Sequence, residues 1–101
     1  MVRTDTRMLL VEIADRFGKN LVRARKRAGM SQEEVGIRAA LHRTEIGLLE
    51  RGERLPRIDT MVKLAGALQV PPVELIAGID WEPGDTTRGN FKVAATDPSM
   101  N

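Results

Sequence analysis

The sequence predicts an all-α fold of five helices, followed by a short extension of different composition. Three observations indicate this fold class: apolar residues recur at helical spacing near the start, a serine cap opens a helix at residue 31, and glycine or proline follows the later helices. The chain has 101 residues, of which 42% are hydrophobic. This length and composition support one domain with a modest tail.

The first helix is expected from about Thr6 to Ala28, where apolar residues recur at intervals of three and four. These positions share one face: Leu10, Ile13, Phe17, Leu21, Ala24 and Ala28. Gly18 is expected to weaken this helix, because glycine costs up to about 1 kcal/mol relative to alanine. Residues 1–12 are expected to be either an amino-terminal arm or an extension of the helix, and residues 13–78 to form the domain.

The stretch SQEEVGIRAALHRTEIGLLERG, from Ser31 to Gly52, predicts two short helices joined by a tight turn. Ser31 and Glu34 can form a capping box, since the serine accepts from an early helical N–H while the glutamate accepts from the N–H of the cap. Gly52 suits the left-handed position after a helix end. Two such helices, the second with polar and basic residues on its outer face, match the helix-turn-helix geometry in which the second helix enters the DNA major groove.

The charges are unevenly distributed along the chain, although the net charge is only +2. Residues 1–57 contain 13 Lys and Arg against 8 Asp and Glu, whereas residues 58–101 contain 3 against 6. The basic part includes the helix pair, as contact with DNA phosphates requires. A chance asymmetry of a solvated surface is the alternative.

Two further helices are expected, at residues 58–68 and 72–77, separated by a break at Gln69-Val70-Pro71. The loop at residues 51–57 contains glycine, proline and three arginines. This composition predicts a segment that follows the DNA backbone, with Arg51 and Arg54 on phosphates. An ordinary connector is the alternative.

The composition changes in residues 79–101, the carboxy-terminal extension. IDWEP and FKV are short β-prone runs on either side of a turn signal, and they favour a small β-hairpin. A hairpin this short is marginal by itself, so Trp81 and Phe91 need a partner surface. The alternatives are dimer contacts, packing on the same chain, and disorder.

Three pieces of sequence, in this order, establish a family resemblance: FGKNLVRARKRAGMSQEEVG, HRTEIGLLERGERLP and IDTMVKLAGALQVPPVELIAGI. From Phe17 to Gly78 the chain resembles the phage repressor and Cro family of DNA-binding domains, also called the xenobiotic response element family. The resemblance implies a compact five-helix repressor-like domain. It also implies a structural ion pair between Arg25 and Glu50 that holds the first helix and the second motif helix in register.

The resemblance places base contacts in the first turn of the second motif helix and one turn later, at Arg43, Thr44 and Leu48. Arg43 can donate two hydrogen bonds to guanine N7 and O6, and Thr44 can offer its hydroxyl or its methyl group. Leu48 can touch a thymine methyl or complete the core. Glu45 can accept from cytosine N4, remain in solvent, or pair with Arg51.

Two residues at helix starts are expected to contact DNA phosphates. The amide of Gln32 joins main-chain N–H groups at the positive end of the first motif helix. His42 occupies the cap position of the second motif helix, where it serves as a phosphate contact or as an imperfect cap.

The side-chain inventory argues against catalysis. The chain has no Cys, no Tyr, one His, and only Ser31 and Ser99 as serines. No nucleophile and base pair, metal cluster or phosphate-binding glycine loop can be assembled from these residues. We therefore expect no enzyme activity, no cofactor and no metal site.

The sequence thus predicts a DNA-binding transcriptional regulator, most simply a repressor that binds a palindromic operator in double-stranded DNA as a homodimer, with residues Arg43–Glu50 in the major groove. No secretory signal or long apolar run is present, so a cytoplasmic location and no membrane partner are expected. The alternatives are a restriction-modification controller, an antitoxin-like protein, and an adaptor that binds a protein partner with little or no specific DNA binding.

Overall fold

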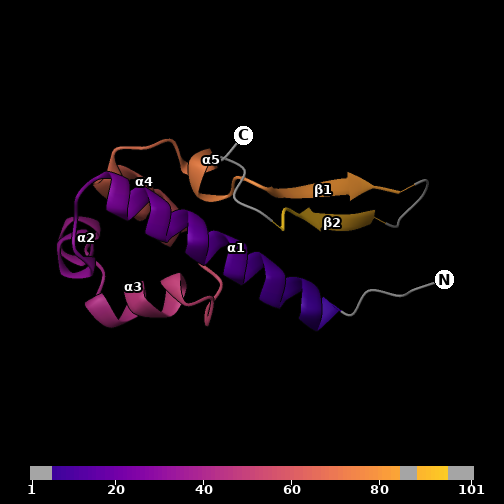
Figure 1. Cartoon of the computed structure of the whole chain (residues 1–101), viewed down its shortest axis with the longest axis horizontal. Helices are drawn as coiled ribbons and strands as arrows, with labels where there is room; N and C mark the ends of the chain where they lie inside the picture. The colour runs from indigo at the N-terminus through magenta and orange to yellow at the C-terminus, as the bar shows by residue number, and fades with distance from the viewer. Residues whose placement is uncertain (1–5, 85–88, 96–101) are drawn as a thin grey trace.

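The chain folds into five helices followed by a two-stranded hairpin, as a computed structural model shows (Figure 1). The structure describes residues 6–84 and 89–95, with side chains from residue 9 onward. The elements are α1 (Thr6–Arg27), α2 (Gln32–Ala39), α3 (Arg43–Glu50), α4 (Ile58–Leu68), α5 (Pro72–Leu75), β1 (Ile79–Pro83) and β2 (Gly89–Val93). The predicted fold class, including the hairpin, is confirmed.

The helix boundaries differ from the prediction at two places, the end of α1 and the end of α5. Helix α1 begins at Thr6, so residues 6–12 extend the helix, and residues 1–5 of the predicted arm lie outside the described residues. It ends at Arg27 rather than Ala28, and Ala28 is exposed. Helix α5 is a single turn that ends at Leu75, two residues earlier than expected. Residues 85–88 and 96–101 of the predicted extension also lie outside the described part of the chain.

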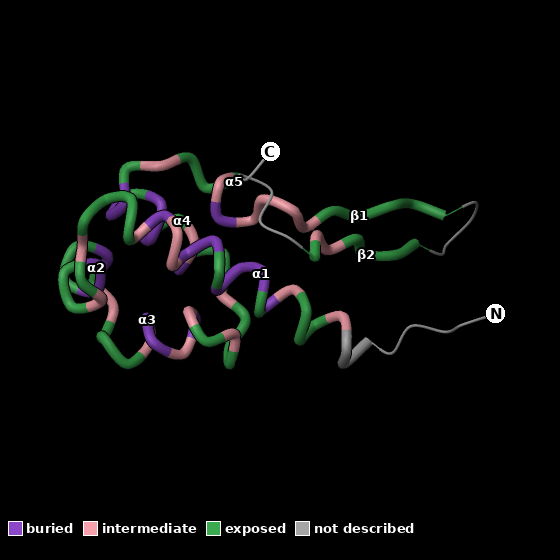
Figure 2. Tube along the Cα trace, viewed as in Figure 1, coloured by how far each residue is buried: buried purple, intermediate pink, exposed green. Residues whose placement is uncertain are grey.

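One apolar core joins all five helices, and Figure 2 shows it as buried segments on their facing sides. Its largest members are at most 1% exposed: Phe17, Leu21, Val35, Ile46, Leu49, Leu64 and Leu75. Each of the two short motif helices has three buried residues, and only two of them belong to this core. Helices of eight residues are unstable alone, so α2 and α3 depend on this shared core.

Local hydrogen bonds start the two motif helices where the sequence predicts. Glu34 N donates to the Ser31 hydroxyl at 3.0 Å, and Ser31 N donates to Glu34 Oε1 at 3.3 Å, so the predicted capping box is present. Gly52 has φ +71°, the left-handed conformation expected after α3. Ala40, which ends α2, is also left-handed at φ 56°. Nothing in the sequence predicted this, because alanine seldom adopts that conformation.

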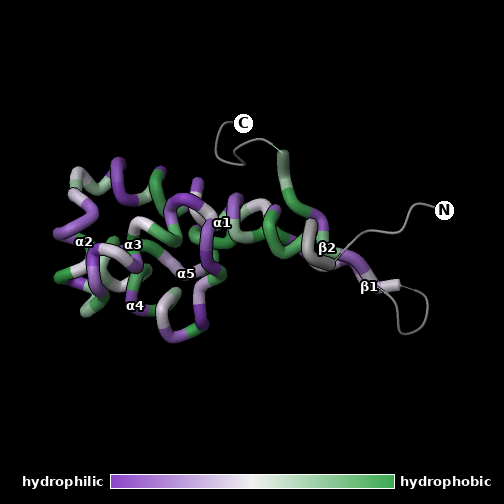
Figure 3. The backbone as a smooth tube through the Cα atoms, turned by 90° about the horizontal axis from the view of Figure 1, so that it is seen from below, coloured by the Kyte–Doolittle hydropathy of each residue, from purple (hydrophilic) through white to green (hydrophobic). Residues whose placement is uncertain are grey.

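The hairpin is an antiparallel pair in which Trp81 is opposite Phe91 and Ile79 is opposite Val93. Its base is fixed to the helical body, because Ile79 packs on the core and Arg16 Nη1 lies 3.5 Å from the Ala94 carbonyl oxygen. From there it extends away from α2 and α3, as Figures 1 and 3 show. Within the described residues, no helix is long and apolar enough to cross a membrane.

Candidate DNA-binding surface

Helix α3 turns one side to the core and the other to solvent. Ile46 and Leu49 are fully buried, whereas Arg43 and Thr44 in the first turn are exposed. Leu48 is half-buried, so its position is compatible both with a thymine contact and with partial packing. The two side chains predicted to read bases in the first turn are therefore free to reach a partner.

His42 caps α3 in the structure. Its Nδ1 accepts a hydrogen bond from the backbone N–H of Thr44 at 3.1 Å. A neutral imidazole that accepts at Nδ1 carries its proton on Nε2, where it can still donate. The two predicted roles, cap and phosphate contact, are therefore compatible, because they use different ring nitrogens.

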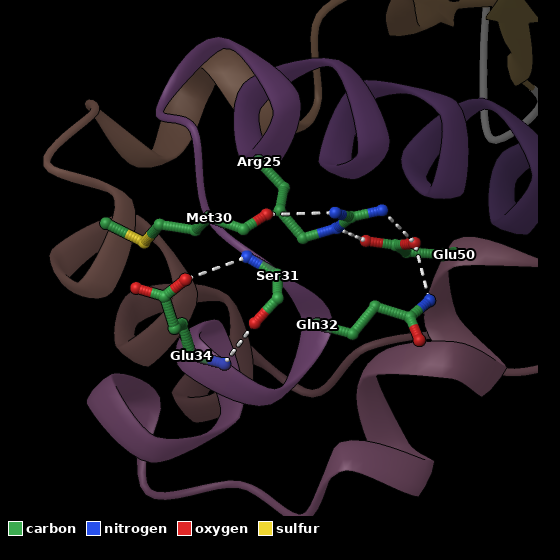
Figure 4. Close-up of polar contacts among 6 residues, drawn as sticks. All are labelled: Arg25, Met30, Ser31, Gln32, Glu34 and Glu50. Carbon is green, nitrogen blue, oxygen red and sulfur yellow. Dashed lines mark hydrogen bonds and ion pairs between the residues drawn. The ribbon is translucent and has the colours of Figure 1, made fainter.

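Glu50, at the end of α3, is the centre of a hydrogen-bond network that joins three helices (Figure 4). Arg25 donates to its carboxylate twice, from Nε at 2.5 Å and from Nη2 at 3.1 Å. The side chains of this pair are 14% and 6% exposed. Arg25 also donates to the Met30 carbonyl oxygen at 3.0 Å. The predicted partners thus lie together, and α1 is tied to α3 and to the loop before α2.

The third donor to Glu50 comes from α2. Gln32 Nε2 donates to Glu50 Oε1 at 2.9 Å, a contact that the sequence did not reveal. One N–H of the Gln32 amide is therefore used inside the protein, and only the second remains for a phosphate. Gln32 is partly exposed, beside a hollow lined by Arg25, Ser31, Gln32, Glu33 and Arg43.

Two ion pairs hold the arginines of the loop after α3. Arg54 donates to Glu45, and Arg51 donates to Glu53 at 2.8 Å. Of the alternatives for Glu45, pairing with Arg51 is wrong, because Glu45 pairs with Arg54 and Arg51 pairs with Glu53. The hydrogen bond to Glu53 and its negative charge raise the pKa of Arg51, so this exposed guanidinium remains protonated.

The sequence analysis missed one acidic residue near this surface. Glu33 lines the hollow between the first turns of α2 and α3, together with Gln32 and Arg43. The sequence did offer a reason to consider Glu33: it lies in the first turn of α2, where the helix dipole stabilises a carboxylate. Its negative charge makes the hollow less basic than Arg25 and Arg43 alone would make it.

The sequence is similar to those of known helix-turn-helix proteins. The helix-turn-helix family matches residues 21–75, which include α2 and α3. The chain is 41% identical over 69 residues to an uncharacterized HTH-type transcriptional regulator, y4dJ, from Sinorhizobium fredii, covering 68% of this chain and 90% of that protein. It is 38% identical over 61 residues to the control protein C.BamHI of Bacillus amyloliquefaciens, covering 59% of this chain and 75% of that one.

A solved structure gives the same result. The restriction-modification controller protein C.AhdI from Aeromonas hydrophila matches with a TM-score of 0.60 and 37% identity, covering 61% of this chain and 94% of that chain. The family match spans more than half of the sequence. It includes the Arg25–Glu50 ion pair and the exposed first turn of α3. The chain therefore belongs to the helix-turn-helix family of DNA-binding transcriptional regulators.

Proposed function

We propose that this chain is a repressor that binds an inverted-repeat operator as a homodimer, with one α3 in the major groove of each half-site. Its action consists of binding alone, without catalysis. The observation that carries the proposal is the exposure of Arg43 and Thr44 at the start of a helix whose other side is fixed in the core. A rigid helix that presents its amino-terminal side chains suits direct readout of base edges.

The phosphate contacts proposed for Gln32, His42, Arg51 and Arg54 would position this helix. Within the described part of the chain, neither the second N–H of the Gln32 amide nor His42 Nε2 has a hydrogen-bond partner. Arg51 and Arg54 lie on the loop that follows α3, and each is exposed. Contacts of this kind fix the register of the protein on DNA, whereas base contacts specify the sequence.

The homodimer follows from the size of the reading surface. Helix α3 has eight residues, and its exposed first turn reaches only a few base pairs. Two half-sites about one helical turn apart, or about 34–36 Å, would add the affinity and specificity that one helix lacks. A repressor could then act by blocking access of polymerase to the promoter.

Selection of binding sites from a random duplex DNA pool tests the proposal. The wild type is compared with the double variant Arg43→Ala and Thr44→Ala, and with the control Lys63→Ala, which removes an exposed cation from α4. We expect the wild type and the control to enrich the same inverted repeat. The double variant should lose it while still binding DNA at low salt, because phosphate contacts remain.

The opposite result would favour the adaptor. If the wild type enriches no motif and its binding disappears at about 200 mM salt, only sequence-independent contacts operate. The pairing of Glu45 with Arg54 is the observation that favours this alternative, since it neutralises one cation beside α3.

Control of restriction-modification genes is a second candidate, because C.BamHI and C.AhdI are named as control proteins. The selected operator distinguishes the candidates. A site upstream of this chain's own gene and of a neighbouring endonuclease gene would favour a controller, and a site elsewhere would favour a general repressor.

A further inference from the structure

The hairpin has one uncharged face and one charged face. Alternation along the strands places Ile79, Trp81 and Pro83 of β1 on one side, opposite Val93, Phe91 and Gly89 of β2. The other side carries Asp80, Glu82, Asn90 and Lys92, with Lys92 Nζ 3.0 Å from Glu82 Oε2. A sheet with one apolar face normally covers that face with another surface.

This apolar face is continuous with the core at one end and open at the other. Ile79 packs against the core, and Val93 lines a hollow together with Arg16 of α1. Further out, Trp81 and Phe91 touch only partly: their ring centroids are 5.0 Å apart in a T-shaped arrangement, yet they remain 56% and 36% exposed. The contact with Phe91 therefore does not cover Trp81.

The amino-terminal half of α1 also carries exposed apolar side chains. The amino-terminal half of α1 extends from the helical body on the same side as the hairpin, away from α2 and α3 (Figure 1). There Leu10 is 40% exposed and Val11 is 62% exposed. Four of the exposed large apolar side chains of the described residues thus lie on the hairpin and the amino-terminal half of α1, and the others lie on α2, the loop after α3, α4 and α5: Ile37, Leu55, Ile58, Val62 and Val73.

The charges indicate how a second copy could meet this surface. Pairing of β1 with β1 of another copy about a two-fold axis at Trp81 would place Asp80 opposite Glu82, and like charges in opposite positions are unfavourable. The uncharged face brings no such pair together. A symmetric contact uses the same patch on both copies, so an uncharged patch is complementary to itself.

We infer that the apolar face of the hairpin is covered by the same face of a second copy of this chain, with Trp81 and Phe91 at the centre of the contact. The inference rests on the homodimer proposed above and identifies its interface. Aromatic side chains suit this position, because each buries about 150–250 Å² and hot spots are enriched in them.

Trp81 is the only tryptophan, so its fluorescence reports on this face directly. Emission and acrylamide quenching are measured over a range of protein concentration, beside sedimentation velocity on the same samples. We expect the emission to shift to shorter wavelength and the quenching to fall as the dimer forms. Phe91→Ser should raise the dimer dissociation constant by roughly thirtyfold or more.

Two further variants separate loss of the contact from loss of the fold. Lys92→Ser also introduces a serine into β2, but at the next residue, which lies on the opposite face, and it should leave the dimer intact. Pro83→Lys adds a charge to the exposed end of the apolar face without removing the aromatic pair, and should weaken the dimer as Phe91→Ser does. Both weakened variants should still bind a single half-site at high protein concentration, because α3 is unchanged.

The outcomes distinguish the inference from the proposed function. If sedimentation reports a dimer while Trp81 emission stays constant, the interface lies elsewhere and the inference is wrong, but the homodimeric repressor stands. If the chain stays monomeric at every concentration and no inverted repeat is selected, both fail, and the hairpin face is left to a different partner.

Discussion

The backbone of Gly18 in α1 lies directly against the carbonyl oxygen of Glu50 at the end of α3. A methyl group on Gly18 would be 2.6 Å from that oxygen and 2.6 Å from the carbonyl oxygen of Leu49. The residue that the sequence marked as a weak point in the helix is therefore a place where the backbones of α1 and α3 are in close contact. The same approach brings Arg25 within reach of the Glu50 carboxylate.

Gly18→Ala should therefore destabilise the protein, although alanine favours helices. Forcing a methyl group against backbone atoms costs about 1–3 kcal/mol, more than the gain of up to about 1 kcal/mol in helix propensity. Gly66→Ala in α4 is the control, because nothing lies within 4 Å of a methyl group there, and it should stabilise by about 0.5–1 kcal/mol. Urea unfolding measures both, and a stabilised Gly18→Ala variant would contradict the close contact.

Arg16, which is buried, and Arg25, which is partly buried, should respond differently to the same substitution. Arg25→Met leaves the Glu50 carboxylate, 6% exposed, without its cation and should cost about 3–5 kcal/mol of unfolding free energy. Arg16 is 4% exposed, and among the described residues its Nε has no hydrogen-bond partner. Arg16→Met removes a desolvated charge but also the hydrogen bond to the Ala94 carbonyl oxygen, so it should cost no more than about 1 kcal/mol. Comparable losses in both variants would mean that Arg16 has a stabilising role of its own.

The stability of α3 should depend on its cap, His42. His42→Ala removes the acceptor for Thr44 N and should cost about 1 kcal/mol, whereas His42→Ser supplies a hydroxyl in its place and should recover most of the loss. Thermal unfolding compares the variants at one pH and salt concentration. DNA affinity gives a second readout: if His42 Nε2 also contacts phosphate, the serine variant recovers stability but not affinity.

Release of Arg54 should strengthen binding to DNA of any sequence. Glu45→Gln removes the carboxylate that Arg54 contacts and takes a negative charge away from α3. Affinity for non-specific duplex should rise, and its dependence on the logarithm of salt concentration should steepen by up to about one unit, as expected for one more phosphate contact.

Titrations of each variant with non-specific duplex at several salt concentrations check this result. Glu53→Gln is the matched variant, because it releases Arg51 in the same way. A Glu45→Gln variant that instead loses discrimination at one base pair, with an unchanged salt slope, would show that Glu45 reads a base.

Signals within one or two turns of chain made much of the fold predictable. The capping box at Ser31, the left-handed Gly52 and the alternation in the hairpin depend on neighbouring residues, and each is present as expected. The pairing of Arg25 with Glu50 spans 25 positions, and only the family resemblance suggested it. The sequence by itself therefore determined where the helices and strands form, because the residues that start and end them are close together in the chain.

The tertiary structure decided which polar groups remain available. Asn20, fully buried, donates to the carbonyl oxygens of Leu75 and Ala77 at 3.0 and 2.9 Å and ties α1 to the end of α5, 55 to 57 residues away. Gln32 is held by Glu50, and Arg54 rather than Arg51 meets Glu45. Such partners depend on how the helices pack, and local spacing carries no information about that packing.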